Sequence, residues 1–72
     1  MRVRITEAAL LRDLIGLLLR SGCVAHAVGE DSCVVVHVHA CDADEAWREV
    51  AFFIRAWRAQ HPDVDAELTA GR

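Results

Sequence analysis

The chain has 72 residues, enough for one small domain, and carries a net charge of −3. A mildly acidic chain without a basic stripe is a poor candidate for nucleic-acid binding. The longest apolar segment is broken by Arg12 and Asp13 and is too short to span a bilayer, and we expect no secretory leader because it lacks a basic start and a cleavage site. We therefore expect a soluble cytoplasmic protein without a membrane or nucleic-acid partner. All of its cations are Arg, and the absence of Lys, Asn and Tyr fits a GC-rich, bacterial genome.

The first element is an expected strand at residues 1–5, because apolar and polar side chains alternate there. Val3 and Ile5 form its inner side, and Arg2 and Arg4 form its outer side. This pattern is typical of a strand in a sheet that is covered on one face only.

A helix is expected to follow, with Thr6 as its N-cap, to run to about Ser21 and to stop at Gly22. Leucines at helical spacing form its apolar stripe. Ile15 and Leu19 widen that stripe, which suggests contact with a second helix or with another subunit.

Residues 23–29 and 32–40 read as two strands joined by a turn at Glu30 and Asp31, which predicts a β-hairpin. We expect Gly29 opposite Ser32. The even-numbered valines of the second strand (Val34, Val36, Val38) then lie under the helices. The uncovered face carries Val24, His26, Val28, Cys33, Val35, His37 and His39.

A second helix is expected from the capping-box spacing of Asp42 and Glu45 to about Gln60, before Pro62. Phe52 projects from its outer side and is a candidate anchor for a contact.

Residues 64–68 alternate again and predict a last strand. The order βαββαβ predicts an α+β, ferredoxin-like sandwich: a four-stranded antiparallel sheet, order 4-1-3-2, with two helices on one face. We expect one domain over residues 1–70 and a tail at 71–72. Asp65 and Glu67 would then lie beside Arg2 and Arg4 on the open face.

Cys33 and Cys41 lie too far apart along one expected strand to form a disulfide, and no C-x-x-C pair occurs, so we expect free thiols. Three histidines could converge on Zn²⁺ or another transition ion, although their spacing matches no common metal motif. The metal candidates are His26, His37 and His39. No other cofactor is expected.

The chain is similar in plan, but not in motif, to two families that pair their subunits. ACT-type regulatory domains bind small ligands at their interfaces, and dimeric α/β-barrel proteins stack their open sheets. RNA-recognition, heavy-metal-associated and acylphosphatase domains share the plan, but this chain lacks their open-face aromatics, C-x-x-C and Asn.

An uncovered apolar face on so small a domain favours a self-associating, non-enzymatic binding or regulatory module, a homodimer with an unknown small-molecule ligand. The alternatives are a dimeric α/β-barrel-type enzyme with a sheet-face histidine as general base, and a His-based transition-metal protein. The expected ligand or interface residues are His26, Cys33, Val35, His37, His39 and Phe52.

Overall fold

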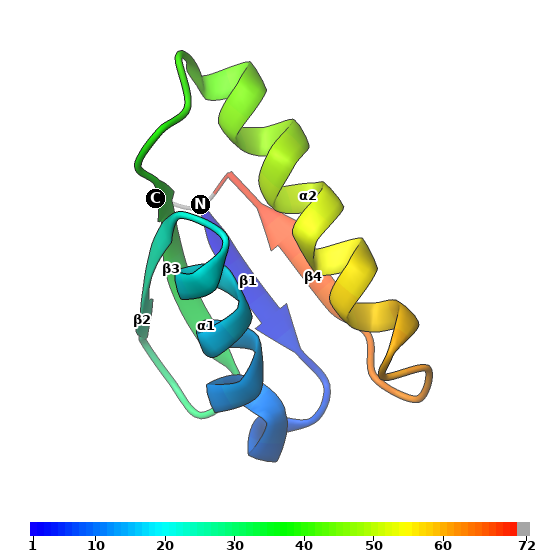
Figure 1. Cartoon of the computed structure of the whole chain (residues 1–72). Coiled ribbons are helices and arrows are strands. Elements are labelled where there is room, and N and C mark those ends of the chain that lie inside the picture. Colours follow the sequence, from blue (N-terminus) through cyan, green and yellow to red (C-terminus); the bar gives the residue numbers. More distant parts are fainter. Residues whose placement is uncertain (71–72) are drawn as a thin grey trace.

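A four-stranded antiparallel sheet carries two helices on one of its faces and leaves the other face open (Figure 1). The computed structural model describes residues 1–70, so the predicted tail at 71–72 lies outside the described residues. The elements are β1 (Arg2–Ile5), a 3-10 turn η1 (Ala8–Leu10), α1 (Leu11–Arg20), β2 (Cys23–Ala27), β3 (Ser32–His37), α2 (Ala43–Ala59) and β4 (Ala66–Thr69).

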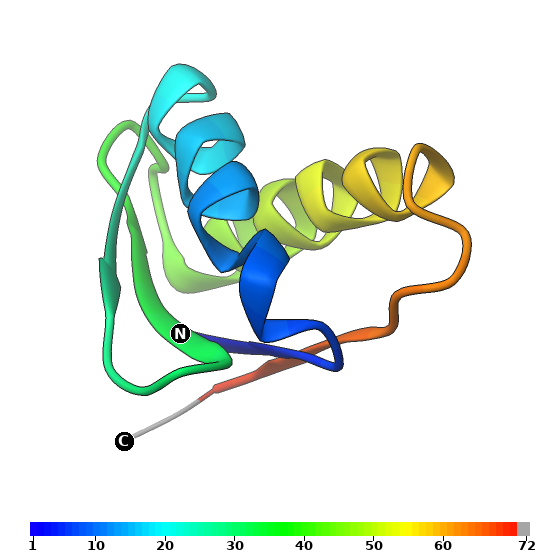
Figure 2. The same ribbon diagram turned by 90° about the horizontal axis from the view of Figure 1, so that it is seen from below.

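The strand order β2-β3-β1-β4 confirms the ferredoxin-like, α+β prediction, because β1 lies beside β4 and the β2–β3 hairpin lies at the other side. Figure 2, seen along the sheet, shows both helices on the same side of it. Val3 and Ile5 of β1 are buried beneath the helices, as their alternation with arginine predicts. The core cluster consists of Val3, Ile5, Leu11, Leu14, Leu18, Cys23, Ala25, Cys33, Val35, Val50, Ile54, Trp57 and Val64.

The prediction that Thr6 caps the first helix is wrong. The chain first makes the turn η1, and neither η1 nor α1 has a side-chain cap at its start. The Thr6 hydroxyl instead accepts the backbone N–H of Asp65 at 3.0 Å, and the backbone N–H of Thr6 donates to the Asp65 carbonyl. Thr6 therefore ties the end of β1 to the start of β4.

The capping prediction for the second helix is confirmed. The Asp42 carboxylate accepts the backbone N–H of Glu45 at 2.8 Å, and the Glu45 carboxylate accepts the N–H of Cys41. Gly22, which ends α1, has a φ of 91°, a conformation that favours glycine.

The predicted register of the hairpin is wrong by one residue. Ala27 lies opposite Cys33 and Ala25 lies opposite Val35, and Val28 bonds to Ser32 across the turn. The turn therefore contains three residues, not two. Because side chains alternate along a strand, this shift moves every side chain of β3 to the other face.

As a result, Cys33, Val35 and His37 lie under the helices, where Cys33 and Val35 are fully buried. Val34 and Val36, which the sequence placed in the core, lie on the open face, and Val38 is exposed just beyond the strand. The prediction for β2 holds for Cys23 and Ala25, which are buried, and for Val24 and His26, which are exposed, whereas Ala27 at the end of the strand is exposed.

Turn chemistry and the neighbouring strand explain the shift. Glu-Asp does not favour the two-residue hairpin turn, which needs positive φ angles at its centre. Cys33 also lies directly opposite Val3 of β1, and directly opposite residues share a face. Since Val3 belongs to the core, Cys33 must face the core as well.

None of the helices within residues 1–70 is long and apolar enough to cross a membrane.

Candidate functional site

The half of the open sheet face formed by β2 and β3 is apolar. Val24 lies opposite Val36, and both are exposed. Val28 and Val38 continue the alternation at the two strand ends, and Val34 is partly buried between them. Four of these side chains are exposed by between 39% and 57%. We call this set the valine patch: Val24, Val28, Val34, Val36 and Val38.

His26 lies on the open face, as predicted, within the valine patch, and it pairs with Val34 across the β2–β3 ladder in place of the expected Val35. Its side chain is exposed. Along β2 its neighbours on the same face are Val24 and Val28. Among the described residues it takes part in no side-chain hydrogen bond or ion pair, so its imidazole is free to meet a binding partner.

The other half of the open face, formed by β1 and β4, is charged. Arg4 lies opposite Glu67, and Arg2 lies opposite Thr69. The sequence predicts that Arg2 and Arg4 lie beside Asp65 and Glu67. The strand register confirms this only for Arg4, which lies opposite Glu67. Arg4 donates to Asp31 of the hairpin turn at 3.4 Å.

Asp65, expected beside the arginines, instead accepts from Arg58 of α2 at 2.8 Å. Asp65 precedes the first residue of β4, so its side chain is not held by the ladder to the open face.

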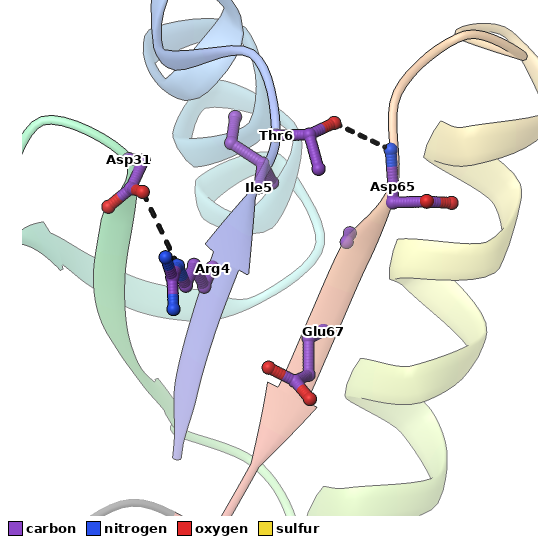
Figure 3. A pocket seen from close by; sticks show the side chains of 7 residues that line it. Arg4, Ile5, Thr6, Asp31, Asp65 and Glu67 are labelled. Carbon is purple, nitrogen blue, oxygen red and sulfur yellow. Dashed lines mark hydrogen bonds and ion pairs between the residues drawn. The ribbon is translucent and has the colours of Figure 1, made fainter.

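A hollow of about 490 Å³ lies where the end of β1 meets β4 and the hairpin turn (Figure 3). Its apolar lining residues are Ile5 and Ala66. Figure 3 shows Arg4 turned toward Asp31, with Glu67 on the neighbouring strand. The hollow is lined by Arg4, Ile5, Thr6, Asp31, Asp65, Ala66 and Glu67, a set without a cysteine or a histidine. It therefore offers charged groups for recognition, and its one hydroxyl, that of Thr6, already accepts the backbone N–H of Asp65.

His37 is placed very differently from the prediction. Its side chain is only 5% exposed and lies 2.5 Å, Nε2 to Oε1, from Glu49 of α2. Its Nδ1 accepts the backbone N–H of His39, so the neutral ring carries its proton on Nε2 and donates it to Glu49. The ring also packs against Phe53. With both nitrogens engaged, His37 joins β3 to α2 and has no free lone pair for a metal or a substrate.

The three histidines suggested as metal ligands are not brought together. His26 lies on the open face, His37 lies under α2, and His39 is exposed in the turn after β3. Within residues 1–70, no group of three or more His, Cys, Asp and Glu side chains is arranged to hold a metal ion.

The cysteines are free among the described residues, as expected. Burial raises the pKa of the Cys33 thiol, and burial together with the charge of Glu49 raises the pKa of the Cys23 thiol. A raised pKa keeps a thiol protonated and therefore a poor nucleophile at neutral pH. Cys41 is exposed.

Phe52 is exposed by 61% on the outer side of α2, as predicted, far from the open sheet face because α2 covers the opposite side of the sheet. The sequence reading missed Glu49 and Arg58, which bind His37 and Asp65. The sequence predicts Glu49 as an ordinary solvated charge and indicates no role for Arg58, because no local pattern marks a helix residue that reaches a distant strand.

These features define a class: a small α+β domain of ferredoxin-like strand order whose uncovered sheet face is half apolar and half charged. No family model, no curated protein and no solved structure matches the chain.

Proposed function

We propose that the protein is a small, non-enzymatic, self-associating module in which the valine patch of one copy stacks on the valine patch of a second copy. The observation that carries this proposal is the distribution of valine. Five of the nine valines belong to the patch, and only four lie in the core. A contiguous apolar patch on an uncovered sheet commonly marks a contact surface.

The energy of burial supports a second copy as the occupant. The exposed surface of the valine patch equals about two fully exposed valines, whose burial is worth about 3 to 6 kcal/mol for each copy. A domain of this size buries only about 60% of its unfolded surface and is marginally stable alone. Stacking two identical patches gives both copies the burial that they lack.

Charge placement supports stacking that is centred on the hairpin. Arg2, Arg4 and Glu67 lie to one side of the patch, on β1 and β4. A stack centred on β2 and β3 buries valine against valine and leaves these charges at the rim, in water. Interfaces commonly have this arrangement of an apolar centre and a polar rim.

The surroundings of His26 favour contact over catalysis. A general base needs a proton within hydrogen-bond reach and is commonly oriented by a second polar group. The neighbours of His26 on its face are valines, and no described carboxylate contacts it. Of the histidines considered as a base, it is the one that remains on the open face.

Sedimentation equilibrium on matched variants tests the proposal. Val36→Glu places a charge in the centre of the patch, whereas Thr69→Glu places the same charge on the same face, outside the patch. Both side chains are exposed, so neither change disturbs the core. We expect association of the wild type, weaker association of Val36→Glu, and unchanged association of Thr69→Glu. Equal association of all three folded proteins would refute the proposal.

A further inference from the structure

The free edge of β2 presents unpaired backbone groups. In an antiparallel pair, alternate residues bond to the neighbouring strand. Val28 donates to Ser32, and Val38 donates to Gly22 on the same ladder, so the even-numbered residues of β2 bond to β3. The N–H and C=O groups of Cys23, Ala25 and Ala27 therefore point outward, without a partner among the described residues.

Nothing in the sequence of β2 hinders further pairing. Edge strands commonly carry a proline, a bulge or an inward charge that blocks the approach of another strand. β2 reads CVAHA and pairs with β3 residue for residue along its whole length. The opposite edge strand, β4, contains Glu67 and follows Asp65, both of which oppose an approaching strand.

The flank of α1 above this edge carries two apolar side chains, Ile15 and Leu19, with the exposed Arg12 one helical turn before Ile15. The opposite flank of α1 faces α2. Asp13 on this flank binds Trp57 of α2, and Leu17 lines a small hollow beside Trp57. At helical spacing, Ile15 and Leu19 lie on the flank away from α2, and Leu19 is exposed by 54%. α1 covers β2, so this flank and the β2 edge form one surface on the same side of the molecule (Figure 1).

We propose that a second copy of the chain pairs antiparallel with β2 along this edge and joins two four-stranded sheets into one of eight strands, with the two α1 flanks in contact. This interface rests on the backbone of β2 and on Leu19, and it is separate from the stacking of open faces. α1 and β2 each span about 15 Å, so the helix flank and the strand edge match in length.

The outward groups define a two-fold register centred on Ala25. In this register Ala25 pairs with Ala25 of the second copy, and Cys23 pairs with Ala27 of the second copy. The side chains beneath the helices at the seam are then all small, which lets the two α1 flanks approach. On the open face, Val24 lies opposite His26 of the second copy.

This pairing changes the position of the valine patch. In one chain the patch occupies one side of the open face, with charged residues on the other. In the paired sheet two patches join at the centre, and the charged strands β1 and β4 lie at both outer ends. The eight-stranded sheet thus has the apolar centre and charged rim that a stacked interface requires. Pairing with a second copy brings a second valine patch to this centre, which pairing with a strand from an unrelated protein does not.

The experiment combines an edge variant with the face variant described above. Leu19→Glu places a charge on the exposed flank of α1, and Ala27→Pro removes an outward N–H at the end of β2. Neither side chain belongs to the core. Phe52→Glu, which replaces an exposed apolar residue on α2, is the control. Light scattering after size exclusion gives the mass of each folded variant against the 8.0 kDa chain.

We expect the wild type and Phe52→Glu to be tetramers. Leu19→Glu, Ala27→Pro and Val36→Glu each remove one of the two interfaces and should be dimers. Leu19→Glu combined with Val36→Glu removes both interfaces and should be a monomer. A monomeric Val36→Glu would overturn edge pairing and leave the stacking of open faces standing. A dimer that Val36→Glu does not change and Leu19→Glu abolishes would overturn the stacking alone.

Hydrogen exchange of the β2 amides adds a direct readout of the backbone. Edge pairing predicts slow exchange at Cys23, Ala25 and Ala27 in Val36→Glu at high concentration, and fast exchange once Leu19→Glu is added. Fast exchange at these three amides in both proteins would overturn the proposal.

Discussion

The imidazole of His37 at the end of β3 is bound to the carboxylate of Glu49 in the middle of α2. This contact spans the gap between the sheet and the helix layer, and it gives the nearly buried Nε2–H group its acceptor. The same ring accepts the backbone N–H of His39, so the contact also holds the turn that leaves β3. His37 therefore supports the fold and takes no part in the open face.

Removing the acceptor of His37 is expected to destabilise the protein. Glu49→Ala leaves a nearly buried N–H without a partner, which costs about 1–3 kcal/mol. Glu49→Gln keeps an acceptor oxygen, so its free energy of unfolding should fall by less than that of Glu49→Ala. Arg48→Ala, one position away on the exposed side of α2, is the control and should change the free energy of unfolding by less than about 0.5 kcal/mol. Urea denaturation measures all three, and equal stability of Glu49→Ala and Arg48→Ala would contradict the structural role of His37.

A second polar contact joins the two helices. The indole N–H of Trp57 in α2 donates to the Asp13 carboxylate of α1 at 2.7 Å, and Trp57 is buried. Asp13→Ala should lower the free energy of unfolding by about 1–3 kcal/mol, because the indole N–H loses its acceptor. Asp13→Asn retains an acceptor oxygen, so its free energy of unfolding should lie between those of Asp13→Ala and the wild type. If Asp13→Ala unfolds at the wild-type urea concentration, the contact contributes nothing to stability.

Thiol reactivity should separate the cysteines cleanly. Cys41 is exposed, whereas Cys23 and Cys33 are buried with raised pKa values. We expect a thiol reagent to label Cys41 quickly in the native protein and the other two only after unfolding. Mass spectrometry of the labelled peptides measures this difference. Fast labelling of Cys33 in the native state would place it on an accessible face and contradict the register of β3.

The raised pKa values also predict a loss of stability at alkaline pH. Above about pH 9 the thiols of the unfolded chain ionise while those of Cys23 and Cys33 stay protonated in the folded state. The unfolded state then binds fewer protons, so the free energy of unfolding falls as pH rises until the folded thiols also ionise. Since the chain has no Lys and no Tyr, other side chains contribute little in this range.

Cysteine variants provide the controls for this alkaline effect. Cys33→Ala should show a shallower fall above about pH 9, and Cys41→Ala should show the wild-type slope. An unchanged slope in Cys33→Ala would exclude Cys33 as a source of the alkaline loss.

The strand order and the layers were predictable from the sequence because β1, β4 and the helices have unambiguous periodicity. Arg2 and Arg4 alternate with Val3 and Ile5, so only one face of β1 suits the core. The same logic failed at β3, where Cys33, Val34, Val35 and Val36 are all apolar. A run without alternation suits either face, so the turn and the neighbouring strand decide the register.

The candidate site was predictable in kind but not in its residues. An uncovered apolar sheet face follows from the fold, and His26 was placed on it correctly because β2 has a clear pattern. The one-residue shift places Cys33, Val35 and His37 under the helices, where the sequence predicts Val34 and Val36, and places these two valines on the open face. The polar contacts that fix His37 join residues far apart along the chain, and no local pattern reveals them.

Contact between valine patches is the central claim, and isotope-filtered NMR tests it most directly. A sample that mixes chains carrying labelled valine methyl groups with unlabelled chains reports contacts between copies only. Five of the nine valines belong to the patch. The account predicts intermolecular contacts from Val24 and Val36 and none from the core residue Val50. Intermolecular contacts from Val50, or none from Val36 at millimolar concentration, would contradict it.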